Sequence, residues 1–109
     1  MLTPLRRRSD FVAANRGKRA PTPGFLLLVR TRDDGDPVMR IGITVTRKLG
    51  GAVVRNRMKR RFRALARQIL PEAGIEGADH VMIGRSDGIE RSFAKLADEL
   101  RSALTRVRK

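Results

Sequence analysis

The chain has 109 residues, which favours a single domain, and it lacks cysteine, which excludes a disulfide framework or a thiolate metal site. Its formal net charge is +14, from 25 lysines and arginines against 11 aspartates and glutamates. No apolar run approaches the roughly 18 residues that a membrane span needs, and the N-terminus lacks the apolar core of a secretory signal. We therefore expect a cytoplasmic protein, since a reducing compartment fits the absence of cysteine.

The positive charge is concentrated in the middle third of the chain. Residues 37–71 hold ten basic residues and no acidic one, whereas residues 72–109 hold seven of each. Such a block predicts a polyanionic partner, and we favour nucleic acid. A membrane surface fits less well, because a lipid-docking helix uses tryptophan or a bulky apolar face, and the chain has no tryptophan.

The N-terminal part predicts one short helix followed by two strands. Ser9 can cap a helix over residues 10–15, which Gly17 ends, and "APTPG" then breaks any helix. The apolar run over residues 25–32 predicts a buried strand. "DDGDP" after it predicts a turn, because the spacing and the closing glutamate of a calcium loop are missing.

Residues 38–46 alternate between apolar and other side chains, which predicts a strand with one face in the core and one open face. The core face carries Ile41, Ile43 and Val45, and the open face carries Arg40, Gly42, Thr44 and Thr46. We expect this strand and the preceding one to pair as a tight antiparallel hairpin.

Between Gly51 and Pro71 the sequence predicts a helix with two stripes. The apolar stripe is Val54, Met58, Phe62, Leu65 and Ile69. The basic stripe is Arg55, Lys59, Arg63 and Arg67, widened by Arg57 and Arg60. Like charges at this spacing repel one another, and nothing acidic on the helix relieves the repulsion. The apolar stripe should dock on the sheet and the basic one should face an external polyanion; a merely solvated helix is the alternative.

The last third predicts a short buried strand over residues 80–85 and a closing helix over residues 92–107, with Ser92 as its N-cap. The inner face of that helix carries Phe93, Leu96, Ala97, Leu100, Leu104 and Val107. The order of elements predicts an α+β fold of two layers.

The residues offer little for catalysis by the protein alone. His80, the only histidine, begins a predicted strand, which favours a structural role over a general base. The chain has no Walker or dinucleotide-binding loop. The basic helix is rich in arginine, whose planar fork bridges two phosphate oxygens. Asn56 within it can hold a loop, or donate to a phosphate or a base edge.

The open face of the sheet is a second candidate surface. Thr44, Thr46, Arg47 and Lys48 lie on it or just past it, and Phe11 of the first helix could cover it. An aromatic ring among hydroxyls and cations suits single-stranded nucleic acid, whose bases stack and whose phosphates pair with cations. Ordinary core packing of Phe11 stays open as the alternative, and the other three phenylalanines are expected in the core.

Residues 47–63, "RKLGGAVVRNRMKRRFR", resemble the signature of the bacterial ribonuclease P protein component family. The matching positions are Arg47, Lys48, Gly50, Ala52, Val53, Arg55, Asn56, Arg57, Lys59 and Arg60. A weaker likeness covers most of the chain, including "SDF" in the first helix and "RIGITVTRK" in the strand before the basic helix.

The resemblance implies a subunit of an endoribonuclease, in which a large RNA removes the 5′ leader of precursor tRNA with magnesium that it mainly binds itself. The protein would have no catalytic residue and bind no metal alone. It would bind the RNA subunit, one to one, through Arg55, Asn56, Arg57, Lys59, Arg60, Arg63 and Arg67. It would hold the leader in a cleft between the first helix and the sheet, through Phe11, Arg40, Thr44, Thr46, Arg47 and Lys48.

The resemblance also implies an α–β sandwich of order α-β-β-β-α-β-α, with the basic helix in a left-handed βαβ crossover. General handedness rules would predict the opposite hand. The family often has a second aromatic on the first helix and another at the end of its first strand, where this chain has Asn15 and Leu28. Stacking in the cleft should therefore depend on Phe11.

Two functions of other classes stay open on the sequence. One is a structural RNA-binding protein of ribosomal type with no part in processing, and the other is a DNA-binding module. Precursor cleavage that does not improve when the protein is added would favour the first. Tighter binding to duplex DNA than to ribonuclease P RNA at equal salt would favour the second.

Overall fold

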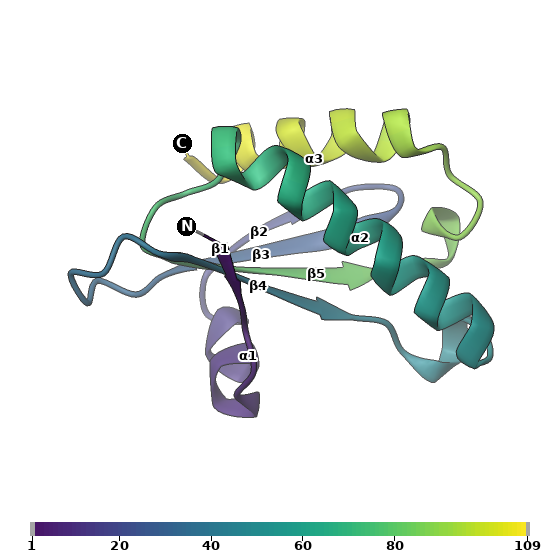
Figure 1. Ribbon diagram of the computed structural model, residues 1–109, viewed down its shortest axis with the longest axis horizontal. Coiled ribbons are helices and arrows are strands. Elements are labelled where there is room, and N and C mark those ends of the chain that lie inside the picture. The colour runs from purple at the N-terminus through teal and green to yellow at the C-terminus, as the bar shows by residue number, and fades with distance from the viewer. Residues whose placement is uncertain (1, 109) are drawn as a thin grey trace.

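The computed structural model describes residues 2–108, which form one five-stranded sheet and three helices. In chain order the elements are β1 (Leu2–Pro4), α1 (Arg8–Ala14), β2 (Lys18–Pro21), β3 (Phe25–Thr31), β4 (Met39–Thr44), α2 (Ala52–Ala73), β5 (Ala78–Gly84) and α3 (Phe93–Arg108), with 3₁₀ turns η1 (Arg47–Leu49) and η2 (Ser86–Gly88) (Figure 1). The predicted order of helices and strands is confirmed, and β1 is an addition to it.

The sheet has the order β1-β4-β5-β3-β2. β5 lies in its centre, antiparallel to β3 and parallel to β4, while β1 runs parallel to β4 at one edge. The expected hairpin of β3 with β4 is therefore wrong. Six of the seven residues of β5 are buried, so this strand takes the central position, between the two strands that the turn after β3 connects.

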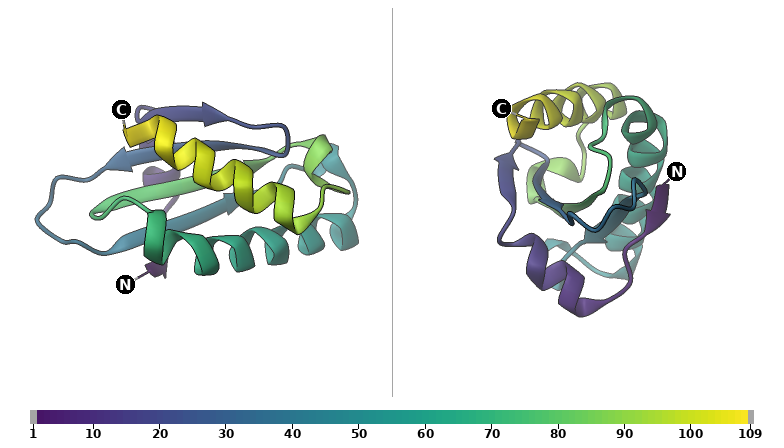
Figure 2. Two further views of the ribbon diagram at one scale, coloured as in Figure 1. Left: turned by 90° about the horizontal axis from the view of Figure 1, so that it is seen from above. Right: turned by 90° about the vertical axis from the view of Figure 1, so that its left-hand side faces the viewer.

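The basic helix α2 connects two neighbouring parallel strands, β4 and β5. Figure 2 (left) shows the sheet from the side of α2 and α3. When this view is turned so that β4 and β5 run upward, β5 lies to the left of β4, and α2 crosses in front of the sheet from one to the other. The crossover is thus left-handed, as the resemblance implied and against the strong general preference for the right hand.

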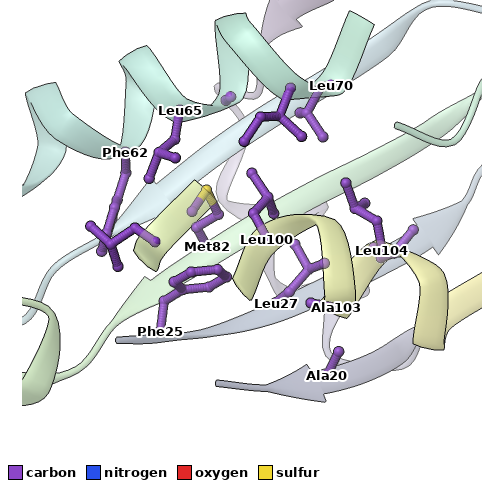
Figure 3. Packing of buried hydrophobic residues seen from close by; sticks show 14 of the residues in the cluster. Ala20, Phe25, Leu27, Phe62, Leu65, Leu70, Met82, Leu100, Ala103 and Leu104 are labelled. Atoms are coloured by element: carbon purple, nitrogen blue, oxygen red, sulfur yellow. The ribbon is translucent and has the colours of Figure 1, made fainter. Parts of the chain in front are cut away.

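Two helices cover one face of the sheet and one covers part of the other. α2 and α3 lie side by side over the first face, and α1 lies on the opposite face (Figures 1 and 2). The larger core is between the sheet and the helix pair, where Phe25 of β3 and Phe62 of α2 meet edge to face with ring centroids 5.8 Å apart (Figure 3). A smaller core under α1 contains Leu5, Ala14, Leu28 and Val81.

The alternation in β4 has the predicted effect. Ile41 and Ile43 pack against the larger core, whereas Gly42 faces the ring of Phe11 on the α1 side. The apolar stripe of α2 also docks as expected, since Met58, Phe62, Leu65 and Ile69 are buried. One face of the sheet is therefore covered by helices, and the other is partly open.

Helix ends differ from the predictions in two of three cases. α1 begins at Arg8, so Ser9 lies inside its first turn and does not cap it. α2 does not stop at Pro71 but continues to Ala73. The helix tolerates Pro71 in its last turn, because the missing proline N–H leaves only the Arg67 carbonyl without its usual donor. The predicted cap of α3 is confirmed, since the Ser92 Oγ accepts a hydrogen bond from the Lys95 N–H at 3.2 Å.

Candidate nucleic-acid interface

The solvent-facing side of α2 carries a basic row, which we define as Arg55, Asn56, Arg57, Lys59, Arg60, Arg63 and Arg67. Arg57, Arg60, Arg63 and Arg67 are exposed, and Arg55 and Lys59 are half-buried. Within residues 2–108, none of these cations forms an ion pair or a hydrogen bond through its side chain. The chain's own carboxylates therefore do not neutralise the row, and its arginines other than Arg55 are exposed.

Arg55 and Asn56 occupy the start of the row. The Nε atom of Arg55 is buried and has no hydrogen-bond partner in the part of the chain that the structure describes. Asn56 is exposed, so its amide can reach a partner outside the molecule. Both residues follow Gly51, which precedes the first turn of α2 without a side-chain cap. Free backbone N–H groups and a positive helix end at this place add to the attraction for phosphate.

Arg61 belongs to the same helix but has another role. Its guanidinium donates hydrogen bonds to the carbonyl oxygens of Gly88, Ile89 and Arg91, which ties the segment between β5 and α3 to α2. Arg61 is therefore a structural arginine, while its neighbour Arg60 is exposed. The helical spacing had placed Arg60 in the basic stripe and Arg61 in neither stripe.

A cleft lies between α1 and the open face of the sheet. Its lining contains two of the predicted residues, Phe11 and Thr44. Asn15 and Leu28, at the positions where the family often has aromatics, also line it. The further lining residues, which the sequence did not assign to the cleft, are Arg6, Arg8, Val12, Ile43, Val81 and Ile83. The sheet contributes aliphatic side chains to this lining, and the N-terminal segment contributes Phe11 and the two arginines. The run of three arginines at the start of α1 was the sequence signal for these two cations.

The position of Phe11 depends on a glycine in the sheet. A Cβ atom added to Gly42 would lie 2.5 Å from the Cε1 and 2.6 Å from the Cζ of the Phe11 ring. The ring therefore rests directly on the backbone of β4, where no side chain could stand. Phe11 is half-buried and lines the cleft while it packs on the smaller core, so both interpretations of this residue describe part of its surroundings.

Arg40, which was predicted to bind the leader, does not line this cleft. Its guanidinium donates hydrogen bonds to the buried carboxylate of Asp79, and its Nη1 lies 3.4 Å from the Oδ2 of Asp10 on α1. The hydrogen bond with Asp79 raises the pKa of Arg40. This side chain links β4 to β5 and to α1.

Thr46, Arg47 and Lys48 lie beyond the end of β4, at the entry to η1 and within it. All three are exposed, and none lines the cleft described above. Arg47 and Lys48 have no ion pair among the described residues. They carry their charge in the segment that joins the strand bordering the cleft to the basic row of α2.

His80 is a core residue, as expected. Its side chain is wholly buried, its Nε2 accepts a hydrogen bond from the N–H of Ile75 at 3.1 Å, and burial lowers its pKa from 6.5 to about 4. Residues 2–108 contain no group of three or more His, Cys, Asp or Glu side chains that could hold a metal ion. No helix in the same range is long and apolar enough to cross a membrane.

Comparisons with known proteins agree on one family. The model of the family described as Ribonuclease P matches residues 2–108. The chain is 55% identical over 104 residues to a protein of Erythrobacter litoralis named "Ribonuclease P protein component", covering 95% of this chain and 84% of that protein. A protein of Gluconacetobacter diazotrophicus with the same name is 46% identical over 104 residues, covering 94% and 89%.

Solved structures share the fold. The RNase P protein of Thermotoga maritima superposes with a TM-score of 0.81 at 31% identity, covering 94% of this chain and 96% of that one. The RNase P protein of Staphylococcus aureus superposes with a TM-score of 0.78 at 24% identity, covering 94% and 93%.

Proposed function

Because the chain belongs to the family of bacterial ribonuclease P protein components, we propose that it binds the catalytic RNA of that enzyme and the 5′ leader of precursor tRNA, and thereby assists removal of the leader. The observation that carries this proposal is the basic row of α2, whose cations have no partner of opposite charge within residues 2–108. Charges held in this way on a rigid helix favour an external polyanion.

The N-terminal half of the row is the proposed contact with the RNA subunit. Arg55, Asn56, Arg57, Lys59 and Arg60 follow the 3₁₀ turn and lie within about two turns of the helix start. Arginine forks can bridge neighbouring phosphate oxygens, and the uncapped helix end adds backbone donors. We propose one protein per RNA subunit, acting in the cytoplasm.

The cleft between α1 and the sheet is the proposed site of the leader. A base can stack on the ring of Phe11, and the Thr44 hydroxyl can donate to or accept from a base or a phosphate. Arg6 and Arg8 at the border can pair with phosphates, while Arg47 and Lys48 extend the positive charge towards α2. Arg40 is left out of this proposal because its charge is paired with Asp79 and Asp10 and it does not line the cleft.

The chemistry itself is assigned to the RNA subunit and its magnesium ions. The protein contributes positive charge that lowers the repulsion between two RNA molecules and so lowers the magnesium concentration that their complex needs. The described residues supply neither a cluster of metal ligands nor an exposed histidine for acid–base work.

The test is multiple-turnover cleavage of precursor tRNA by a bacterial ribonuclease P RNA, with and without this chain, over a range of magnesium concentrations. We expect no cleavage by the protein alone and efficient cleavage at lower magnesium when it is added. Unchanged cleavage on addition would contradict the proposal and favour a structural RNA-binding protein of ribosomal type.

A further inference from the structure

We propose that the basic row of α2 serves two RNA molecules, and that Arg63 and Arg67 bind the single-stranded leader after it leaves the cleft. This inference rests on the proposed function. It departs from the expectation that the whole row binds the RNA subunit.

The first observation is a second groove that joins the cleft. It lies between β1 and α2 and is bordered by Thr3, Pro4, Gly42, Arg63 and Arg67. Phe11 and Ile43 line both this groove and the cleft between α1 and the sheet. The two hollows are therefore neighbours at these residues, and we read them as one path from the open face of the sheet to the flank of α2.

The path turns round an unpaired stretch of strand edge. β1 pairs with β4 at Met39–Ile41, the Leu5 N–H donates to the Ile41 carbonyl, and the chain then crosses the edge of β4 on its way to α1 (Figure 1). Within residues 2–108, no strand pairs with the outer side of β4 from Gly42 to Thr44. A strand of RNA can pass from one face of the sheet to the other at this edge.

The charges along the path all have one sign. Arg6 and Arg8 border its first end, and Arg63 and Arg67 border its second. No aspartate or glutamate lines either hollow. Arg63 and Arg67 are one helical turn apart, about 6 Å along the axis, and both are exposed. Two cations at this spacing can neutralise neighbouring phosphates of one strand.

The rest of the row does not line the groove, because it lies nearer the start of α2 or, for Arg57, further round the helix. At 3.6 residues per turn, Arg60 and Arg57 lie about 60° and 120° around the helix from Arg63, and neither lines the groove. A stiff duplex cannot follow a path that bends round a strand edge, whereas a single strand can. The occupant that fits is therefore the unpaired leader, and the folded RNA subunit is left to the outward side of α2.

The first experiment removes the two charges and varies the leader. The double variant Arg63→Gln with Arg67→Gln is assembled with ribonuclease P RNA, and its affinity is measured for precursor tRNAs with leaders of increasing length. We expect affinity for the longer leaders to fall about tenfold, with a salt dependence lower by about two, and affinity for the shortest leader and for the RNA subunit to stay unchanged. The matched control, Lys95→Gln with Arg101→Gln on the outer side of α3, loses the same charge and should leave every affinity unchanged.

The second experiment places a probe in the groove. Because the chain has no cysteine, Thr3→Cys gives a single site for a photo-crosslinking label, and Ser102→Cys on α3 gives the control. We expect the label at position 3 to crosslink to the longer leaders and the label at position 102 to crosslink to none.

Two outcomes would overturn the inference without touching the proposed function. One is an equal loss for all leaders together with weaker binding of the RNA subunit, which would return Arg63 and Arg67 to that partner. The other is unchanged affinity for long leaders with no crosslink from position 3. Failure of the proposed function would show itself separately, as wild-type protein that does not promote precursor cleavage.

Discussion

Arg40 donates two hydrogen bonds to Asp79, from Nε to Oδ1 at 2.6 Å and from Nη2 to Oδ2 at 2.7 Å. The two residues are register partners on the parallel strands β4 and β5. Arg32 adds a third hydrogen bond to the same carboxylate at 3.0 Å. Burial alone would raise the pKa of Asp79, but the hydrogen bonds from Arg40 and Arg32 outweigh it and hold the pKa below its ordinary value. Asp10 then links this buried group to α1 through Arg40.

We expect Asp79→Asn to lower the free energy of unfolding by about 3 kcal/mol, because it leaves the guanidinium groups of Arg40 and Arg32 without their buried counter-charge. Urea denaturation followed by circular dichroism measures the change. Asp98→Asn is the control, since Asp98 is largely exposed and its ion pair with Arg101 is 3.8 Å long, so it should have little effect. Equal losses for the two variants would show that the network does not stabilise the sheet.

The stability of the protein should fall in mild acid because of His80. Its pKa is about 4 in the folded chain and 6.5 ordinarily, so the unfolded chain binds a proton first as the pH drops. Above pH 6.5 the protonation of His80 does not change stability. Between pH 6.5 and about 4 it should decrease the free energy of unfolding by about 3 kcal/mol. Asp79 affects stability only at lower pH, because its pKa is lowered by folding. The stabilisation from its carboxylate is complete above the ordinary pKa of 3.8 and is lost as the pH falls below that value.

The variant His80→Gln isolates this effect. A glutamine oxygen can accept the Ile75 N–H that His80 accepts, but glutamine does not titrate. We expect the variant to show a flatter dependence of unfolding free energy on pH between 6.5 and 4, whatever its stability at neutral pH. Parallel curves for the variant and the wild type would assign the acid sensitivity to other groups.

Local periodicity predicted the elements better than their pairing. The alternation in residues 38–46 and the four-residue steps of α2 identify their buried faces, because burial of one face is a local property of a strand or a helix. The hairpin of β3 with β4 failed because β5, thirty-four residues after the end of β4 at Thr44, inserts between them. No pattern within either strand records a partner so far along the chain.

The candidate site was predictable in its charges and not in their roles. Arg40 and Arg60 were both predicted to bind RNA, and Arg61 was assigned to neither stripe of its helix. In the structure, Arg40 is bound by two carboxylates, Arg61 by three carbonyls, and Arg60 by no group within residues 2–108. Which arginine is free depends on what the fold brings within about 3 Å of it, and only the tertiary structure supplies that.

Gly42→Ala should displace the ring of Phe11 and weaken leader binding. The new methyl group would overlap the ring edge, so α1 must shift away from the sheet. Affinity for precursor tRNA in the assembled enzyme should fall more than affinity for mature tRNA, because only the precursor has a leader. Phe11→Ala should have the same selective effect.

The double variant Gly42→Ala with Phe11→Ala tests whether the two residues act together. Since the methyl group has no ring to displace, we expect the double variant to lose no more precursor affinity than Phe11→Ala alone. Additive losses, or equal losses for precursor and mature tRNA, would show that the contact serves only the core.

Substitutions of Arg57 together with Arg60, and of Arg61, should affect RNA binding and stability respectively. Arg57→Ala with Arg60→Ala removes two exposed cations, so assembly with ribonuclease P RNA should weaken and the slope of log affinity against log salt should become shallower by about two. Arg61→Ala instead leaves the carbonyls of Gly88 and Ile89 without their donor, so it should lower the urea midpoint and leave the slope unchanged. Fluorescence anisotropy over a range of salt concentrations measures the slope, and urea denaturation measures the midpoint. If Arg61→Ala flattened the salt dependence while the double variant did not, the outward side of α2 would not be the RNA-binding surface.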